Sequence, residues 1–287
     1  MTGVWTIARL TFDSAARRRV LWALLLLGGA FLGLYLLGLL ALRSGIETAR
    51  SVIGNTLTAE DQRIFEVGLN FVLMAGLYAA NFLIVMMTVL ISIDTLAGEI
   101  NNETIQSIAV KPVRRTEIVL GKWLGFAAIL AVYILLIAGG AMMLVRLVLG
   151  YIAPNPLAGI GIMYLESLML LGLTFLFGTR LSMLACGAVV FGLHGVAFVG
   201  GWVGQFGSML FSEGARNVGK ASQLILPTEG LWRYAAARMQ PSFAGLPRFA
   251  SPFSGGGAPS SDIIGYAVVF GAVALALAVW QFNRRDL

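Results

Sequence analysis

Residues 20–42 read VLWALLLLGGAFLGLYLLGLLAL, a run of 23 residues without a charged side chain. A helix needs about 20 apolar residues to cross the hydrocarbon core of a bilayer, so this run is long enough to span a membrane. Five further runs of comparable length follow it, at residues 67–93, 123–145, 160–179, 181–212 and 263–283. Glu166 and His194 are the only Asp, Glu, Lys, Arg or His residues within the six runs.

The length and continuity of these runs decide the fold class. A backbone that crosses lipid must satisfy its hydrogen bonds internally, and strands of a membrane barrel alternate in polarity over about ten residues. We therefore predict an all-α membrane protein, with a helix in residues 1–19 and a six-helix transmembrane domain in residues 20–287. The first run is too long for the apolar part of a signal peptide, so we interpret it as a retained helix.

Composition supports the same class. The chain is 58% apolar and only 12% charged, whereas soluble domains carry about 25% charged residues. The net charge of +6 comes from basic residues beside the apolar runs, which predicts no nucleic-acid partner. Cys186 is the single cysteine, which excludes an intrachain disulfide.

The distribution of Lys and Arg predicts the orientation. Lys and Arg are enriched in short cytoplasmic loops of membrane proteins. They cluster before the first run, between the second and third, between the fourth and fifth, and after the last. We therefore expect cytoplasmic termini, a cytoplasmic loop at residues 94–122 and an outer loop at residues 204–262, in an integral plasma membrane protein of the bacterial inner-membrane type.

Residues 3–19 have the pattern of an amphipathic helix. Apolar side chains fall on one face and polar side chains on the other, with Trp5 suited to anchor the helix at a bilayer interface. Arg17, Arg18 and Arg19 close the segment. The alternative is a basic flank that only sets the topology.

The loop at residues 94–122 reads DTLAGEINNETIQSIAVKPVRRTEIVLGK. Pro112 interrupts it, and Thr116 and Glu117 suit the start of the next helix. Glu99 and Glu103 lie one turn apart on a short polar helix, where two like charges disfavour an isolated helix by a few tenths of a kcal/mol. A basic partner surface would offset that cost, and a solvated face neutralised by nearby basic residues is the alternative.

The outer loop predicts one further helix. Pro227, Thr228 and Glu229 resemble a helix start, and a stripe of apolar residues follows and ends before Pro241. We expect this helix to lie on, or dip into, the outer interface. At membrane depth we predict a pair between Arg146 and Glu166, with a role either in fixing two helices together or in a transport path.

Sequence motifs for enzymatic chemistry are missing. The chain has no GxxxxGK[ST] motif and therefore no P-loop for ATP. Its single histidine excludes an HExxH metalloprotease, and Cys186 and His194 are too far apart along one helix to share a metal. We expect neither catalysis nor a metal site in this chain.

The layout resembles the membrane subunit of ABC-2-type (type V) ABC transporters. The resemblance rests on the N-terminal helix, the six spans and the order of residues in the 94–122 loop. That loop has acidic residues, a proline–arginine turn, and a further acidic residue before Leu-Gly-Lys. In this sequence the matching residues are Glu99, Glu103, Thr104, Ile105, Lys111, Pro112, Arg114, Arg115, Glu117 and Lys122. The segment at residues 227–233 is similar to one in members linked to copper-enzyme maturation.

The resemblance implies a function and partners. The 94–122 loop and Arg17, Arg18 and Arg19 would dock a separate ATP-binding subunit, which would hold ATP and Mg²⁺. This chain would have no cofactor of its own. A second permease subunit, identical or paralogous, would complete the path, and an outer-face partner protein is a further expectation. The rival interpretations are an ATPase-independent transporter or scaffold and, with little support, an intramembrane hydrolase.

Overall fold

The computed structural model describes residues 3–53, 58–101, 115–241 and 260–284, and every regular element in these ranges is a helix. Six of the helical segments are long and apolar enough to cross a membrane, which confirms the predicted fold class. The elements are α1 (Gly3–Ala16), α2 (Arg19–Ile53), α3 (Ala59–Asn101), α5 (Arg115–Ile134), η1 (Leu135–Gly139), α6 (Gly140–Leu149), α7 (Pro156–Gly178), α8 (Met183–Met209), α9 (Glu213–Ile225), α10 (Thr228–Arg238) and α11 (Asp262–Asn283).

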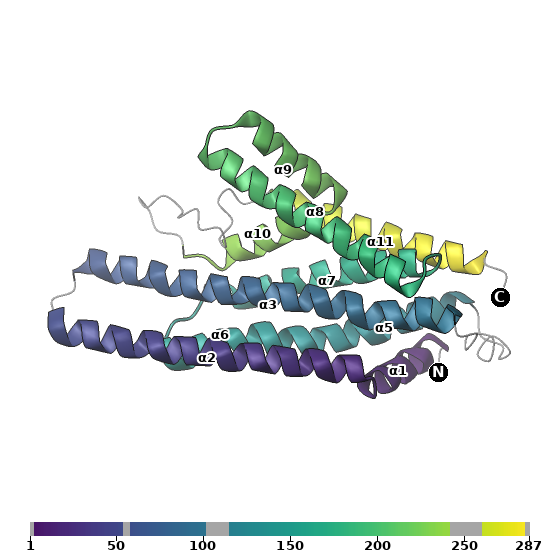
Figure 1. The fold of residues 1–287 in the computed structure, drawn as a ribbon, viewed down its shortest axis with the longest axis horizontal. Coiled ribbons are helices and arrows are strands. Elements are labelled where there is room, and N and C mark those ends of the chain that lie inside the picture. The colour runs from purple at the N-terminus through teal and green to yellow at the C-terminus, as the bar shows by residue number, and fades with distance from the viewer. Residues whose placement is uncertain (1–2, 54–57, 102–114, 242–259, 285–287) are drawn as a thin grey trace.

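The long helices run side by side along the molecule, and both ends of the chain lie at the same end of the bundle (Figure 1). The short helix α1 packs against the first half of α5. The α8–α9 hairpin projects from the bundle at an angle (Figure 1). An even number of spans returns the chain to the side on which it began, so this arrangement follows directly from six crossings.

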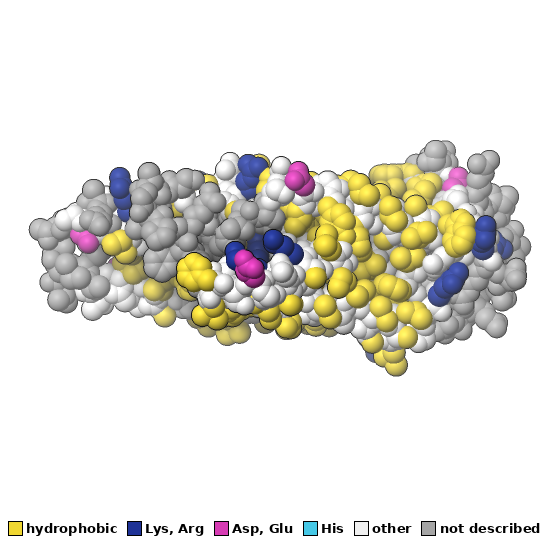
Figure 2. All heavy atoms as spheres, turned by 90° about the horizontal axis from the view of Figure 1, so that it is seen from above, with side chains coloured by type: hydrophobic (Ala, Val, Ile, Leu, Met, Phe, Trp, Pro, Cys, Tyr) yellow, Lys and Arg dark blue, Asp and Glu magenta, His cyan; other side chains and the backbone are white. Residues whose placement is uncertain are grey.

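The helix α7 forms the centre of the bundle and packs against α3, α5, α10 and α11. Its sequence is apolar on all sides, as expected of a helix with neighbours all around it. In contrast, α2 and α11 leave many large apolar side chains exposed. Figure 2 shows hydrophobic side chains over much of one face, with Lys and Arg side chains at the end where the termini lie. Such a surface suits contact with lipid rather than water.

The third span is not one regular helix. It consists of α5 and α6 joined by η1, a single π-helical turn of five residues. Ile137 and Ala138 within this turn are fully buried. The span ends at Gly150, whose φ of 71° is left-handed and therefore suits glycine.

The described part of the connection between α8 and α11, residues 210–241, contains two helices. The predicted helix after Pro227 is α10, and the apolar stripe of its sequence is buried: Leu231, Trp232, Ala235, Ala236 and Met239. It dips into the bundle and contacts α3, α7 and α8. The other helix, α9, was not predicted. Ser212 caps its start, accepting a hydrogen bond from the Ala215 backbone at 3.5 Å.

Candidate functional site

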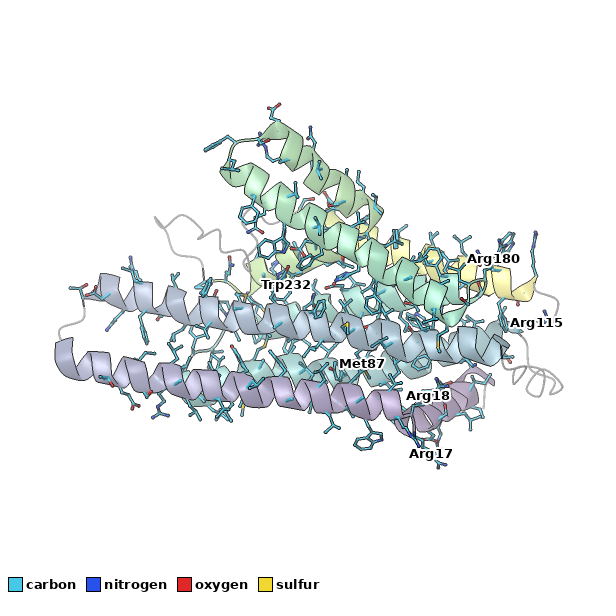
Figure 3. All side chains as sticks on the ribbon, viewed as in Figure 1. Arg17, Arg18, Met87, Arg115, Arg180 and Trp232 are labelled. Atoms are coloured by element: carbon cyan, nitrogen blue, oxygen red, sulfur yellow. The ribbon has the colours of Figure 1, made fainter. Side chains whose placement is uncertain are left out.

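The end of the bundle that holds both termini carries the residues predicted to couple to an ATPase. Figure 3 shows Arg17, Arg18, Arg115 and Arg180 together at this end. Arg19 begins α2, and Glu99 lies on α3 two residues before its end at Asn101. The other predicted coupling residues of the loop lie outside the described residues: Glu103, Thr104, Ile105, Lys111, Pro112 and Arg114.

Two glycines of α5 hold α1 in place. A Cβ atom added at Gly121 would lie 2.8 Å from the Val4 carbonyl oxygen, and one at Gly125 would lie 2.8 Å from the Ala8 carbonyl oxygen. Only glycine therefore allows the two backbones to approach this closely. The contact fixes α1 beside the start of α5, so that the Arg17–Arg19 turn lies at the same end of the bundle as the start of α5.

The acidic and basic residues at the start of α5 differ in their surroundings. Glu117 lies in the first turn of α5, and its carboxylate is so close to Gly3 that an added Cβ there would be 2.6 Å from Oε2. A carboxylate beside the N-terminus of α1 is favoured by the helix dipole. Lys122 is buried, with 5% of its surface exposed, and it has an interaction partner within the chain.

The prediction that Arg146 and Glu166 form an ion pair is wrong. Arg146 lies in the last turn of α6 with an exposed side chain. Glu166 lies in the middle of α7, is 1% exposed, and accepts hydrogen bonds from Asn81 Nδ2 at 3.2 and 3.4 Å. A long basic side chain at the end of a span reaches the surface, whereas a short acidic one at mid-span stays inside.

Glu166 instead belongs to what we call the buried polar cluster. Its members come from four helices: Tyr78 and Asn81 of α3, Glu166 of α7, Trp202 of α8, and Glu229 and Arg233 of α10. Trp202 Nε1 donates to the Tyr78 hydroxyl at 2.8 Å. The Tyr78 ring also packs on Trp232, with ring centroids 5.2 Å apart. Figure 3 shows Trp232 on α10, beside α3 and α8.

The acid and base that α10 contributes lie one turn apart. Arg233 Nε is 3.7 Å from Glu229 Oε1, and Arg233 also donates to the Gly201 carbonyl of α8. A Cβ at Gly201 would lie 2.2 Å from Glu229 Cγ, so the glycine makes room for this side chain. Burial raises the pKa of Glu229 to about 7, against the opposing effects of Arg233 and Tyr78. Glu229 can therefore exchange a proton near neutral pH.

The sequence model of the ABC-2 family transporter proteins matches residues 5–287, nearly the whole chain. The chain belongs to this family. It is thus the transmembrane permease component of an ABC transporter, and the family resemblance of the sequence is confirmed. Membership implies an ATP-binding partner subunit and a surrounding lipid membrane. A comparison with curated proteins finds no match.

Sequence reasoning found only part of the permease's buried polar cluster. Glu166 is identifiable because it stands alone in an apolar run, and Pro227, Thr228 and Glu229 are recognisable as a helix start. Glu229 and Arg233 were assigned to an outer loop, since nothing in a single sequence places a short helix inside the bundle. The available signal was their spacing of four residues, which allows an ion pair on one helix face.

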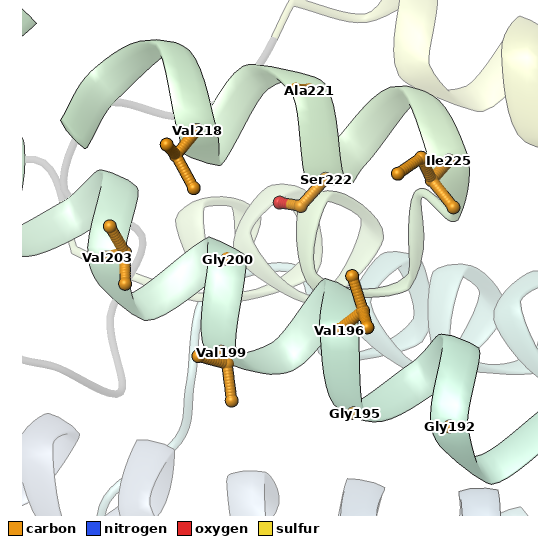
Figure 4. A pocket seen from close by; sticks show the side chains of 10 residues that line it. All are labelled: Gly192, Gly195, Val196, Val199, Gly200, Val203, Val218, Ala221, Ser222 and Ile225. Carbon is orange, nitrogen blue, oxygen red and sulfur yellow. The ribbon is translucent and has the colours of Figure 1, made fainter. Parts of the chain in front are cut away.

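A second feature of the permease is an apolar groove between α8 and α9, with a volume of about 620 Å³ (Figure 4). Val196, Val199 and Val203 line it from α8, and Val218 and Ile225 line it from α9. The one hydroxyl in the lining, that of Ser222, already donates to the Gly219 carbonyl at 2.9 Å. The groove therefore offers hydrocarbon contact and no polar chemistry.

Proposed function

We propose that this permease couples ATP hydrolysis by a separate ATPase subunit to the translocation of a substrate across the membrane. The observation that supports the proposal most is the match to the ABC-2 transporter family over nearly the whole chain. ATP and Mg²⁺ bind to the partner, and a second permease subunit completes the path. The end that carries the termini faces the cytoplasm, in keeping with its Lys and Arg residues.

The ATPase docks on that end through the 94–122 loop and the turn after α1. Support comes from the packing of α1 on α5 through Gly121 and Gly125, which makes α1 and the start of α5 one unit. A force applied by the ATPase to this unit passes directly into the third span, which α5 begins. The similarity of residues 227–233 to members linked to copper-enzyme maturation remains a resemblance, and an outer-face partner remains an expectation.

The experiment is reversal of charge at the docking loop. A Glu99→Lys, Glu103→Lys double variant should lose the co-purifying ATPase, because truncating or reversing one side of a buried charged contact costs about 2–5 kcal/mol. The measurement is vanadate-sensitive ATP hydrolysis by the complex purified from its native membrane. Glu213→Lys is the matched control, since Glu213 is an exposed acid on α9.

Equal ATPase retention in the double variant and in the Glu213→Lys control would contradict docking through this loop. A wild-type permease that purifies without any ATPase activity, and that transports without ATP, would instead favour the alternative function of an ATPase-independent transporter or scaffold.

A further inference from the structure

The pairing of Glu166 with Asn81 leaves one polar atom without a partner. The amide nitrogen of Asn81 faces both carboxylate oxygens, at 3.2 and 3.4 Å, while its carbonyl oxygen Oδ1 is buried and accepts no hydrogen bond. Asn81 itself is only 6% exposed. A buried acceptor without a donor is destabilising, so such an atom calls for an explanation.

An un-ionised Glu166 supplies the missing donor. A neutral carboxyl group has one O–H donor and one carbonyl acceptor, and a primary amide has the complementary N–H donor and carbonyl acceptor. A rotation of the Asn81 side chain that brings Oδ1 to face the carboxyl group lets the carboxyl O–H donate to Oδ1 while Nδ2 donates to the other carboxyl oxygen. The two groups then form a reciprocal pair with every facing polar atom satisfied.

The charges around Glu166 also favour its un-ionised form. The Glu229 carboxylate on α10 is near enough to repel the Glu166 carboxylate, and among the described residues only Asn81 donates a hydrogen bond to Glu166. Arg233 is engaged with Glu229 and with the Gly201 carbonyl, and Tyr78 bonds to Trp202 and Glu229. Helices α5, α8 and α11 and the turn η1 also pack on α7, but no charged group described on them acts on Glu166.

We propose that Glu166 and Asn81 form a proton-binding site that links α7 to α3 and holds α10 in the bundle. With the proton bound, the cluster contains one acid–base pair and one neutral acid. Loss of the proton places two carboxylates, those of Glu166 and Glu229, against a single guanidinium. Their repulsion acts between α7 and α10 and favours an arrangement in which α10 moves out of the bundle. The inference concerns this chain alone and stands whether or not an ATPase docks.

The test is infrared spectroscopy of the full-length permease in lipid vesicles, where an un-ionised buried carboxyl gives a C=O stretching band separate from the carboxylate bands. The measurement is the difference between the spectra of the wild type and Glu166→Gln, in which the contributions of the other carboxyl groups cancel. At pH 7 we expect this difference to contain a protonated carboxyl band. Glu213→Gln, at an exposed acid, should leave the band unchanged.

A second variant tests the pair itself and does not depend on Glu166→Gln folding. Asn81→Leu leaves the carboxyl in place and removes its partner, so the band should move to higher frequency. In the wild type, raising the pH until the band disappears should also change the fluorescence of Trp232, a shift that a Trp232→Phe variant lacks. Absence of a protonated carboxyl band at pH 7, or a band that Asn81→Leu does not move, would overturn the proposal.

Discussion

Replacing Arg233 by methionine tests how much the positive charge in the buried polar cluster contributes to the stability of the protein. Arg233 is buried, with 9% of its surface exposed, and methionine fills much of the same space while removing the charge and its hydrogen-bond donors. Removing one partner of a buried ion pair costs about 3–5 kcal/mol. Here Nε lies 3.7 Å from Glu229 Oε1 and makes no hydrogen bond, which places the loss at the lower end, about 3 kcal/mol.

The stability lost in Arg233→Met depends on pH because Glu229, which remains in the variant, can take up a proton. The pKa of Glu229 is raised by burial to about 7 even with Arg233 present, and without Arg233 it rises further. At pH 5.5 the carboxyl is neutral in the variant, so the cost falls to that of the lost hydrogen bond to Gly201, about 1–2 kcal/mol. At pH 8.5 protonation of the Glu229 carboxyl is itself unfavourable, so the variant loses the full stability of about 3 kcal/mol.

The assay is thermal unfolding in detergent, followed by tryptophan fluorescence at pH 5.5 and pH 8.5. Arg238→Met is the matched control, because Arg238 lies on the same helix with an exposed side chain. We expect Arg233→Met to lower the unfolding temperature more than the control does, and by more at pH 8.5 than at pH 5.5. Equal effects of the two substitutions at pH 8.5, or a larger effect at pH 5.5, would refute the reasoning.

Three further predictions concern stability, packing and orientation. The Glu229 carboxyl should make wild-type stability fall as pH rises from about 5 to 7, by up to about 1.4 kcal/mol per pH unit, because the folded state retains a proton there that the unfolded chain releases near 4.5. Glu229→Gln should remove this part of the slope in the same unfolding assay and leave the part that Glu166 contributes. Gly204→Val should lower the unfolding temperature through a loss of about 1–3 kcal/mol, since its Cβ would lie 2.8 Å from the backbone of α9, whereas Gly29→Val, which meets nothing within 4 Å, should not. A membrane-impermeant thiol reagent on intact cells should label Thr58→Cys but not Ser182→Cys; the reverse pattern would invert the proposed orientation.

The six spans were predictable because lipid imposes a simple rule on sequence. A run such as residues 20–42 has no alternative to a helix once it is too long and too apolar for a soluble core. The start of α10 was equally readable, since Pro227 precedes it and its apolar residues recur at helical spacing. These features depend on residues close together in the chain.

The contents of the buried polar cluster were not predictable in the same way. Glu166 is an obvious intramembrane acid, but its partner could have been any polar residue on a neighbouring helix. Asn81 lies 85 residues earlier and looks unremarkable within its run. The sequence predicts Arg146 as the partner because both charges lie toward the same ends of neighbouring antiparallel spans, but the position of Arg146 at the end of α6 lets it reach the surface. Pairing across helices depends on their rotation about their axes, which a single sequence does not specify.

Rotation about an axis is also what the π-helical turn of the third span controls. A π turn places one more residue in the helix than an α turn does, and each residue of an α-helix advances the chain by about 100°. The turn at Leu135–Gly139 therefore sets which side of α6 faces inward relative to α5. A regular α-helix of the same length would turn Ala141 and Val145, both fully buried, by about 100° out of their present positions. The five residues of this turn thus set the angle between the inward-facing side of α5 and the inward-facing side of α6.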